Sequence, residues 1–216
     1  MCQICRNENL IGCKKLVIEI CPNIIEIPYI EGLLRLDIIQ CKNIRYIPPI
    51  NGLLVLIIIG CPNIINLPYI SSLKGLKLQC KQLKEIPNYN NLIKLELHNE
   101  NIINLPNCPN LELLFLNHTN TIYLPRYEKL SILEIHNCNK LIDIPIYNNI
   151  NKLIIQNCNK LCSLKNINEM ILICKNLKEY KIYNCMLFEN NFNNNLLKLS
   201  KNGLIIKKII NKLKKN

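Results

Sequence analysis

Thirteen cysteines and three histidines are the residues of this 216-residue chain that could bind a metal or act in nucleophilic chemistry. Cys2 and Cys5 form a Cys-x-x-Cys pair, and Cys13 and Cys21 follow within the same stretch. Thiolates are good zinc ligands, but zinc sites favour two closely spaced pairs, and a second pair is missing here. We therefore expect free thiols, and we predict no metal and no cofactor.

A catalytic role is not indicated by any motif. The chain lacks G-x-x-x-x-G-K-[ST], G-x-G-x-x-G, G-x-S-x-G and H-E-x-x-H. A cysteine nucleophile needs a positioned histidine, and the sequence pairs none of the histidines with a thiol. The prediction is a protein that is not an enzyme.

Composition and charge indicate the class of protein and its compartment. Hydrophobic residues make up 49% of the chain, which is enough to bury a sizeable core. The longest apolar run, Leu53 to Ile59, is far shorter than the roughly 18 residues that span a bilayer. The first eight residues contain no apolar signal-peptide core. We expect a soluble, intracellular, cytoplasmic protein with reduced cysteines. The net charge of +12 is uneven, because the segment after Glu189 carries seven lysines and no acid.

A repeat of 19 or 20 residues organises most of the sequence. Seven prolines mark it: Pro28, Pro48, Pro68, Pro87, Pro106, Pro125 and Pro145. A cysteine lies seven residues before most of them, replaced once by Asn99 and once by His118.

Upstream of the cysteine the chain reads Leu33-x-x-Leu36-x-Ile38-x-x-Cys41, and this pattern recurs as far as Cys185. Alternation of apolar residues predicts a short strand, and stacking of successive units would bury its apolar side. The proline half cannot join a ladder of backbone hydrogen bonds, so an extended or single-turn segment is expected there.

This pattern resembles the leucine-rich repeat, L-x-x-L-x-L-x-x-N/C-x-L, over about residues 13 to 190. The short unit with Ile-Pro or Leu-Pro near its end is similar to leucine-rich repeat proteins of giant DNA viruses that infect amoebae. The resemblance implies an α/β-type solenoid: a horseshoe of about nine repeats with a parallel sheet on its concave face. It also implies few or no convex α-helices, and C-terminal helices as a cap. We divide the chain into a solenoid (1–190) and a Lys-rich C-terminal capping helix (191–216).

The resemblance also assigns a structural ladder, in which a small polar side chain bonds to backbone groups of neighbouring turns. Disulfides between rungs are not expected, because the side chains point the same way. His118 does not suit this position, so we expect local distortion in its unit. The ladder residues are Cys21, Cys41, Cys61, Cys80, Asn99, Cys138, Cys158 and Cys185.

Strand side chains that do not face the core are the candidate binding residues. His98 and His136 fall two rungs apart, about 9.6 Å, which is too far for one metal ion. Phe115, with charged neighbours on a rigid scaffold, suits protein recognition. The candidate partner-binding residues are Asp37, Ile57, Lys77, Gln79, Glu96, His98, Phe115, Asn117, Glu134, His136, Gln156 and Tyr183.

The two ends leave alternatives open. No dedicated N-terminal cap is evident, so either the first half-turn or a partner must cover that end. Near the other end, residues 168–175 are expected to form a helix. The basic C-terminal helix is expected to cap the last repeat, although a basic amphipathic helix can also bind anionic membrane or nucleic acid.

The function expected from these features is a non-catalytic protein–protein interaction module that binds a partner protein through the concave face. For a viral chain the partner would be a host protein. One alternative is a substrate-recruiting adaptor of a larger complex of the ubiquitin-ligase type. The other is binding of anionic membrane or nucleic acid through the basic C-terminal helix.

Overall fold

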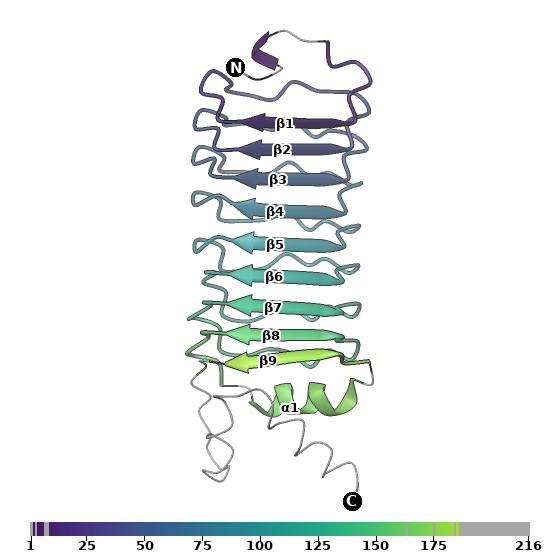
Figure 1. The fold of residues 1–216 in the computed structure, drawn as a ribbon, viewed down its shortest axis with the longest axis vertical. Coiled ribbons are helices and arrows are strands. Elements are labelled where there is room, and N and C mark those ends of the chain that lie inside the picture. Colours follow the sequence, from purple (N-terminus) through teal and green to yellow (C-terminus); the bar gives the residue numbers. More distant parts are fainter. Residues whose placement is uncertain are drawn as a thin grey trace, which may run out of the picture.

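The computed structural model describes residues 2, 4–6, 9–162, 164–174, 176–183 and 185. Nine strands form one parallel sheet, in which each strand pairs with the next in sequence (Figure 1). The predicted solenoid of parallel strands is confirmed. The strands are β1 (Lys15–Glu19), β2 (Arg35–Ile39), β3 (Val55–Ile59), β4 (Gly75–Gln79), β5 (Lys94–His98), β6 (Leu113–Asn117), β7 (Ile132–His136), β8 (Lys152–Gln156) and β9 (Glu179–Tyr183).

The register between strands keeps every motif position aligned. Leu36 pairs with Leu56, and Leu56 with Leu76, so the same repeat position stacks from rung to rung. In β3, Leu56 and Ile58 point inward and are fully buried, while Val55, Ile57 and Ile59 point outward and remain partly exposed. Because successive strand residues face opposite sides, the Leu-x-Ile pattern alone decides which side faces the core.

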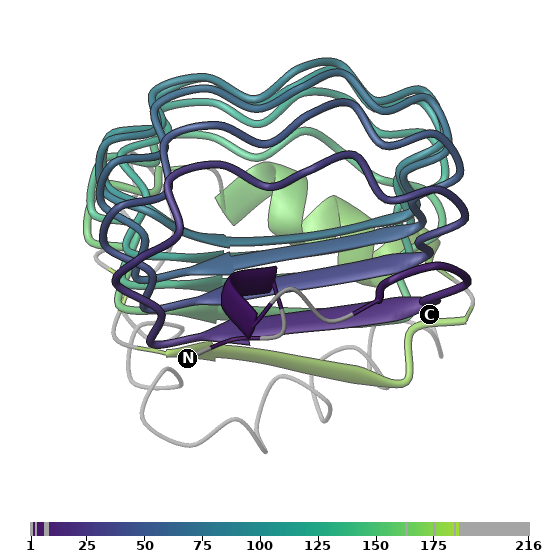
Figure 2. The ribbon, with the colours of Figure 1, turned by 90° about the horizontal axis from the view of Figure 1, so that it is seen from above.

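The segments between successive strands return on the opposite side of the core from the sheet (Figure 2). In one of them Ile44, Ile47, Ile50 and Leu53 are buried, so every third residue points inward. A three-residue period is typical of extended, proline-compatible chain, which has three residues per turn. The prediction of few convex helices is confirmed in the described part of the chain, where one α-helix lies between strands.

Most turns that leave a strand use a residue in the left-handed region. Ile20, Gln40 and His118 have φ values of 47°, 53° and 50°. Such a φ is unfavourable for residues other than glycine. The amide of Gln40, however, donates to the carbonyl of Ile59 on the next rung at 2.7 Å, and Ile20 donates to Ile39 in the same way. The stacking hydrogen bond therefore offsets the strain of the turn.

Three buried tyrosines satisfy carbonyls inside the proline side of the stack. The hydroxyl of Tyr127 donates to the carbonyl of Pro106 at 2.9 Å, and those of Tyr89 and Tyr147 make equivalent bonds one rung back. Each phenol thus packs as a large apolar group and also satisfies a buried carbonyl.

The C-terminal end of the described stack is covered by α1 (Leu164–Ile173), which lies across it beside β9 (Figure 1). Ile167, Met170 and Ile171 are buried among its described side chains. The helix predicted over residues 168–175 is therefore present, but it begins and ends earlier. The capping helix predicted over 191–216 lies outside the described residues. No helix in the described ranges has both the length and the apolar character needed to cross a bilayer.

Candidate functional site

The outward side chains of β1–β9 form the outer face of the sheet. Seen along the stack, β1 and β9 lie further out than the strands between them, so this face is gently concave (Figure 2). All twelve candidate partner-binding residues lie at outward strand positions, in two neighbouring columns. The backbone of Tyr183 is in β9, and its side chain is outside the described set.

The structure adds a third outward column that the sequence analysis missed. It is formed by the first residue of each strand, directly before the first inward position, which is a leucine in β1–β8 and Tyr180 in β9. Alternation from that leucine could have identified it, because the residue before an inward position must face outward. The column consists of Lys15, Arg35, Val55, Gly75, Lys94, Leu113, Ile132, Lys152 and Glu179.

Most charges on the outer face are paired with one another. Glu96 forms ion pairs with Lys77 on the preceding strand and with Lys94 on its own strand. Burial disfavours the Glu96 carboxylate, but the two lysines outweigh that effect and lower its pKa. The Nζ atom of Lys94 also lies 5.1 Å from the centroid of the Phe115 ring, within cation–π range.

The same arrangement recurs toward each end of the face. Lys152 bonds Glu134 at 2.9 Å, and the hydrogen bond raises the pKa of Lys152. On β2, Arg35 Nε lies 2.9 Å from Asp37 Oδ1. The outer face is therefore not a strongly charged surface of one sign, as nucleic-acid binding would require.

Apolar side chains occupy nine outward positions between these ion pairs. Five lie on β1–β3 and four on β6–β8, and two pairs of them, Ile39 with Ile59 and Leu113 with Ile132, are directly opposite in register. Their exposure ranges from 9% at Ile154 to 40% at Val17. The nine are Val17, Ile39, Val55, Ile57, Ile59, Leu113, Phe115, Ile132 and Ile154.

The histidines do not converge on one site. The His98 ring stacks on His118 with centroids 5.2 Å apart, and burial together with the charge of His118 lowers the pKa of His98. His136 instead pairs its Nδ1 atom with Gln156 Oε1 at 3.0 Å. Among the described residues, no group of three metal-ligating side chains lies on the outer face.

Most ladder side chains point into the turn and bond to backbone carbonyls. Cys41 Sγ lies 3.3 Å from its own rung's Ile39 carbonyl and 3.6 Å from Ile18 one rung back. Burial raises the pKa of Cys61 to about 12 and that of Cys80 to about 11. These thiols are therefore protonated and packed as small apolar groups, which makes them poor nucleophiles.

The unit that contains His118 departs from the regular spacing. His118 has a positive φ and an exposed side chain, and so occupies the turn position before the ladder. Thr119 is the ladder residue: it is 1% exposed, and its Oγ1 lies 3.2 Å from Cys138 Sγ. Counting back from Pro125 assumed a constant interval, but this unit lacks one residue after the ladder. The buried Thr121 Oγ1 in that shortened turn has no hydrogen-bond partner among the described residues.

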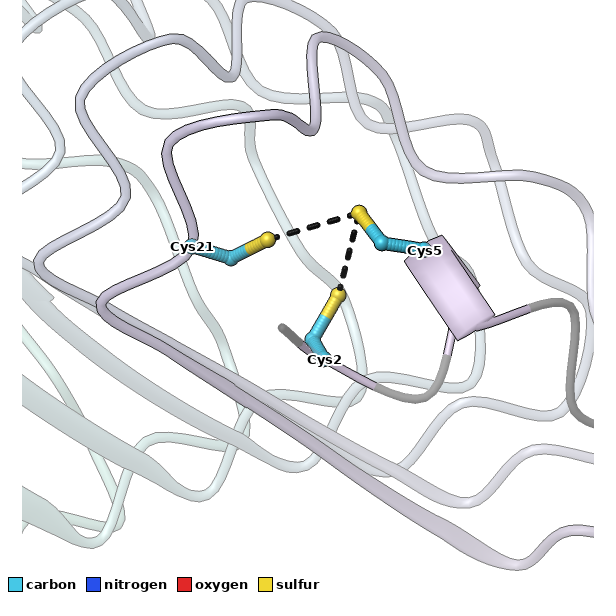
Figure 3. Close-up of side chains that lie close together, drawn as sticks. All are labelled: Cys2, Cys5 and Cys21. Atoms are coloured by element: carbon cyan, nitrogen blue, oxygen red, sulfur yellow. Dashed lines mark hydrogen bonds between the residues drawn. The ribbon is translucent and has the colours of Figure 1, made fainter.

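Three thiols meet at the N-terminal end of the stack (Figure 3). Cys2 precedes the short 3-10 turn η1 (Ile4–Arg6), and Cys5 lies within it. Cys21 lies just after the end of β1. Cys5 Sγ lies 3.6 Å from Cys2 Sγ and 3.4 Å from Cys21 Sγ, and all three sulfurs lie within 4.8 Å of one another. We call Cys2, Cys5 and Cys21 the thiol cluster.

The thiol cluster differs from the grouping considered from sequence. Cys13 is outside it, and its thiol donates to the carbonyl of Lys15 at 3.1 Å. Burial disfavours the Cys21 thiolate, but hydrogen bonds from the Cys2 and Asn23 amides and the two neighbouring thiols lower the pKa of Cys21 to about 7. The hydrogen bond to Cys21 raises the pKa of Cys5 to about 12. The sequence showed these residues but not their contact, which depends on η1 folding back over the first rung.

Comparison with known proteins adds no further assignment: no protein-family model matches the chain, and no curated protein matches it either.

Proposed function

We propose that the chain is a non-catalytic protein-recognition module that binds a partner protein through the outer face. The observation that carries this proposal is the set of nine apolar side chains at outward positions of an uncovered sheet. Parallel sheets are usually buried on both sides, and a strand face that only meets water is normally polar. In the described part of the chain, no helix or strand lies over the outer face.

The size of the face suits a protein ligand. Nine strands at about 4.8 Å spacing and five residues at about 3.3 Å give a surface roughly 38 Å long and 16 Å wide. Its projected area of about 600 Å² is close to the ~800 Å² per partner of a typical stable interface. Apolar groups bordered by polar pairs are the composition expected for an interface core and rim.

We also propose that the unit is a short leucine-rich repeat, of the kind found in giant DNA viruses of amoebae. The consensus apolar positions coincide with the inward strand residues, such as Leu36 and Ile38. The consensus Cys or Asn position coincides with the buried ladder, at Cys41 and Asn99. In such a protein the partner would come from the host cell.

The test uses substitutions that alter the face without disturbing the stack. Phe115 lies between Glu96 and Glu134 in register, so Phe115→Lys introduces a charge that these two carboxylates accommodate. Tyr123→Lys is the matched control, because Tyr123 is a 63% exposed aromatic side chain outside the sheet. Both variants and the parent chain serve as baits in host-cell lysate, and each captured protein is then purified and tested for direct binding.

The proposal expects a directly binding protein whose affinity falls at least tenfold with Phe115→Lys and is unchanged with Tyr123→Lys. Loss of such a residue at an interface core typically costs about 1–2 kcal/mol or more. Equal binding by both variants would exclude this part of the face. Binding lost only on removal of residues 191–216, with steep salt dependence, would instead support the basic segment. Self-association that Phe115→Lys abolishes would identify a second copy of the chain as the partner.

A further inference from the structure

The thiol cluster lies at the first rung of the described ladder, where the pattern of thiol contacts changes. Cys41, Cys61 and Cys80 each direct the thiol toward a carbonyl one rung back, at 3.6–3.7 Å. In the described chain β1 has no strand before it, so Cys21 has no such carbonyl. Its thiol instead faces Cys5 and, within 4.8 Å, Cys2 (Figure 3).

The spacing of the three sulfurs is that of ligands around one ion. With metal–sulfur bonds of about 2.3 Å, two thiolates on one ion lie roughly 3.8 Å apart in tetrahedral geometry and about 4.0 Å apart in a plane. The two closest pairs in the cluster are 3.6 and 3.4 Å apart. The third pair, Cys2 with Cys21, lies within 4.8 Å, so sulfur shifts of about 1 Å or less would seat an ion without any change in the fold.

The surroundings of the cluster favour a metal over three protonated thiols. Cys21 is 1% exposed and Cys2 and Cys5 are half-buried, so the sulfurs are partly removed from water. Thiols are weak hydrogen-bond donors, and mutual S–H···S contacts satisfy them poorly. The nearby thiols of Cys13 and Cys41 already donate to the carbonyls of Lys15 and Ile18, which leaves a set of three ligands.

We propose that Cys2, Cys5 and Cys21 bind one thiophilic metal ion of the Zn²⁺ or Cu⁺ class through three thiolates. Soft sulfur ligands select these ions over Mg²⁺ or Ca²⁺. Binding forms three metal–sulfur bonds, displaces water from the ion and releases the thiol protons to solvent, with no change in oxidation state. Zn²⁺ keeps a water molecule as its fourth ligand, and Cu⁺ is satisfied by three thiolates.

Such an ion would fasten η1 to the first rung. It joins η1 to Cys21, just after β1, and so holds η1 over the end of the apolar core (Figure 1). Solenoids need a cap at each end, and a metal crosslink supplies one where only three residues of helix are present. This role is independent of partner binding by the outer face.

The experiment uses the full chain, purified with a non-thiol reductant and freed of metal by a chelator. Co²⁺ is titrated as a spectroscopic probe for zinc, and the thiolate-to-cobalt charge-transfer band is followed before displacement with Zn²⁺. A second arm titrates Cu⁺ against a colorimetric Cu⁺ chelator. The variants are Cys5→Ser, which removes the central ligand, and two controls, Cys13→Ser and Cys162→Ser. Cys13 lies outside the cluster, and Cys162 is exposed.

The expected result is one ion per chain, with the charge-transfer band present in the parent and in both controls and lost in Cys5→Ser. Circular dichroism must show that Cys5→Ser keeps its sheet signal. Ion binding should also raise the denaturation midpoint of the parent but not that of Cys5→Ser. The arm with the tighter ion identifies the metal. Absence of thiolate coordination by the fully reduced parent would overturn the proposal, as would equal binding by folded Cys5→Ser.

Discussion

Asn99 offers the sharpest test of how the ladder stabilises the stack. It is 2% exposed, and its Nδ2 donates to the carbonyls of Cys80 and Leu83, at 2.9 Å for Leu83. Its Oδ1 accepts from the amide of Asn101 at 2.7 Å. Asn99→Ala removes all three bonds, two of which are buried. At about 1 kcal/mol each, the loss in unfolding free energy is about 3 kcal/mol.

Asn101→Ala is the matched control, two residues away. Its Nδ2 donates to the carbonyl of Lys81, but the side chain is exposed, so water replaces the lost bond. We expect a change within about 0.5 kcal/mol. With a urea m-value of about 2.5 kcal/mol/M, Asn99→Ala should lower the unfolding midpoint by roughly 1.2 M, against about 0.2 M for the control.

The assay is urea unfolding followed by circular dichroism, with amide hydrogen exchange to localise the effect. Exchange should accelerate first in β4 and β5, the rungs that Asn99 joins. Equal midpoints for the two variants would refute the reasoning, because the ladder would then contribute no more than an exposed amide.

Two further predictions follow from buried groups. Tyr127→Phe removes the hydroxyl that donates to the Pro106 carbonyl and should lower the unfolding free energy, measured in urea, by about 1 kcal/mol. Tyr123→Phe, at an exposed site, should change it by no more than about 0.5 kcal/mol. Equal losses for the two variants would contradict the contribution of this bond. Aromatic disulfide reagents at pH 8 should label Cys162 at once but Cys61 and Cys80 only after unfolding. Burial raises the pKa of Cys61 to about 12 and that of Cys80 to about 11. The thiolate fraction of each therefore grows tenfold per pH unit and stays small at pH 8. Prompt labelling of Cys61 in native protein, mapped by mass spectrometry, would contradict this.

The fold could be predicted from the sequence because one pattern repeats with few changes. Each copy of Leu-x-Ile sets an inward face, and stacking in register follows when units have nearly equal length. The outward candidates followed from the same alternation, which is why all twelve lie on strands. The prediction was incomplete where one unit changed length: counting from Pro125 aligned His118, which does not suit the ladder, and so missed Thr119.

Contacts between distant parts of the chain could not be predicted in this way. The approach of Cys5 to Cys21 depends on how η1 folds back, and no periodicity encodes that path. The ion pairs of Glu96 and the ring contact of Lys94 with Phe115 likewise depend on rotamers across strands. Repetition thus fixes the backbone and the direction of side chains, whereas the site depends on positions at which the units differ.

The sequential strand order has a consequence for how such a chain can change length. In the described sheet each strand pairs with its immediate neighbours in sequence. Arg35 lies opposite Val55 in register, and Val55 lies opposite Gly75 in the same way. If residues 55–74 were removed, Gly75 would pair with Arg35 in the sheet, and the pairing of every later strand would stay the same. Gain or loss of whole units by slippage during gene copying would lengthen or shorten the molecule by about 4.8 Å per event. The thiol cluster and α1, which lie at the two ends of the described stack, would be left unchanged by such an event.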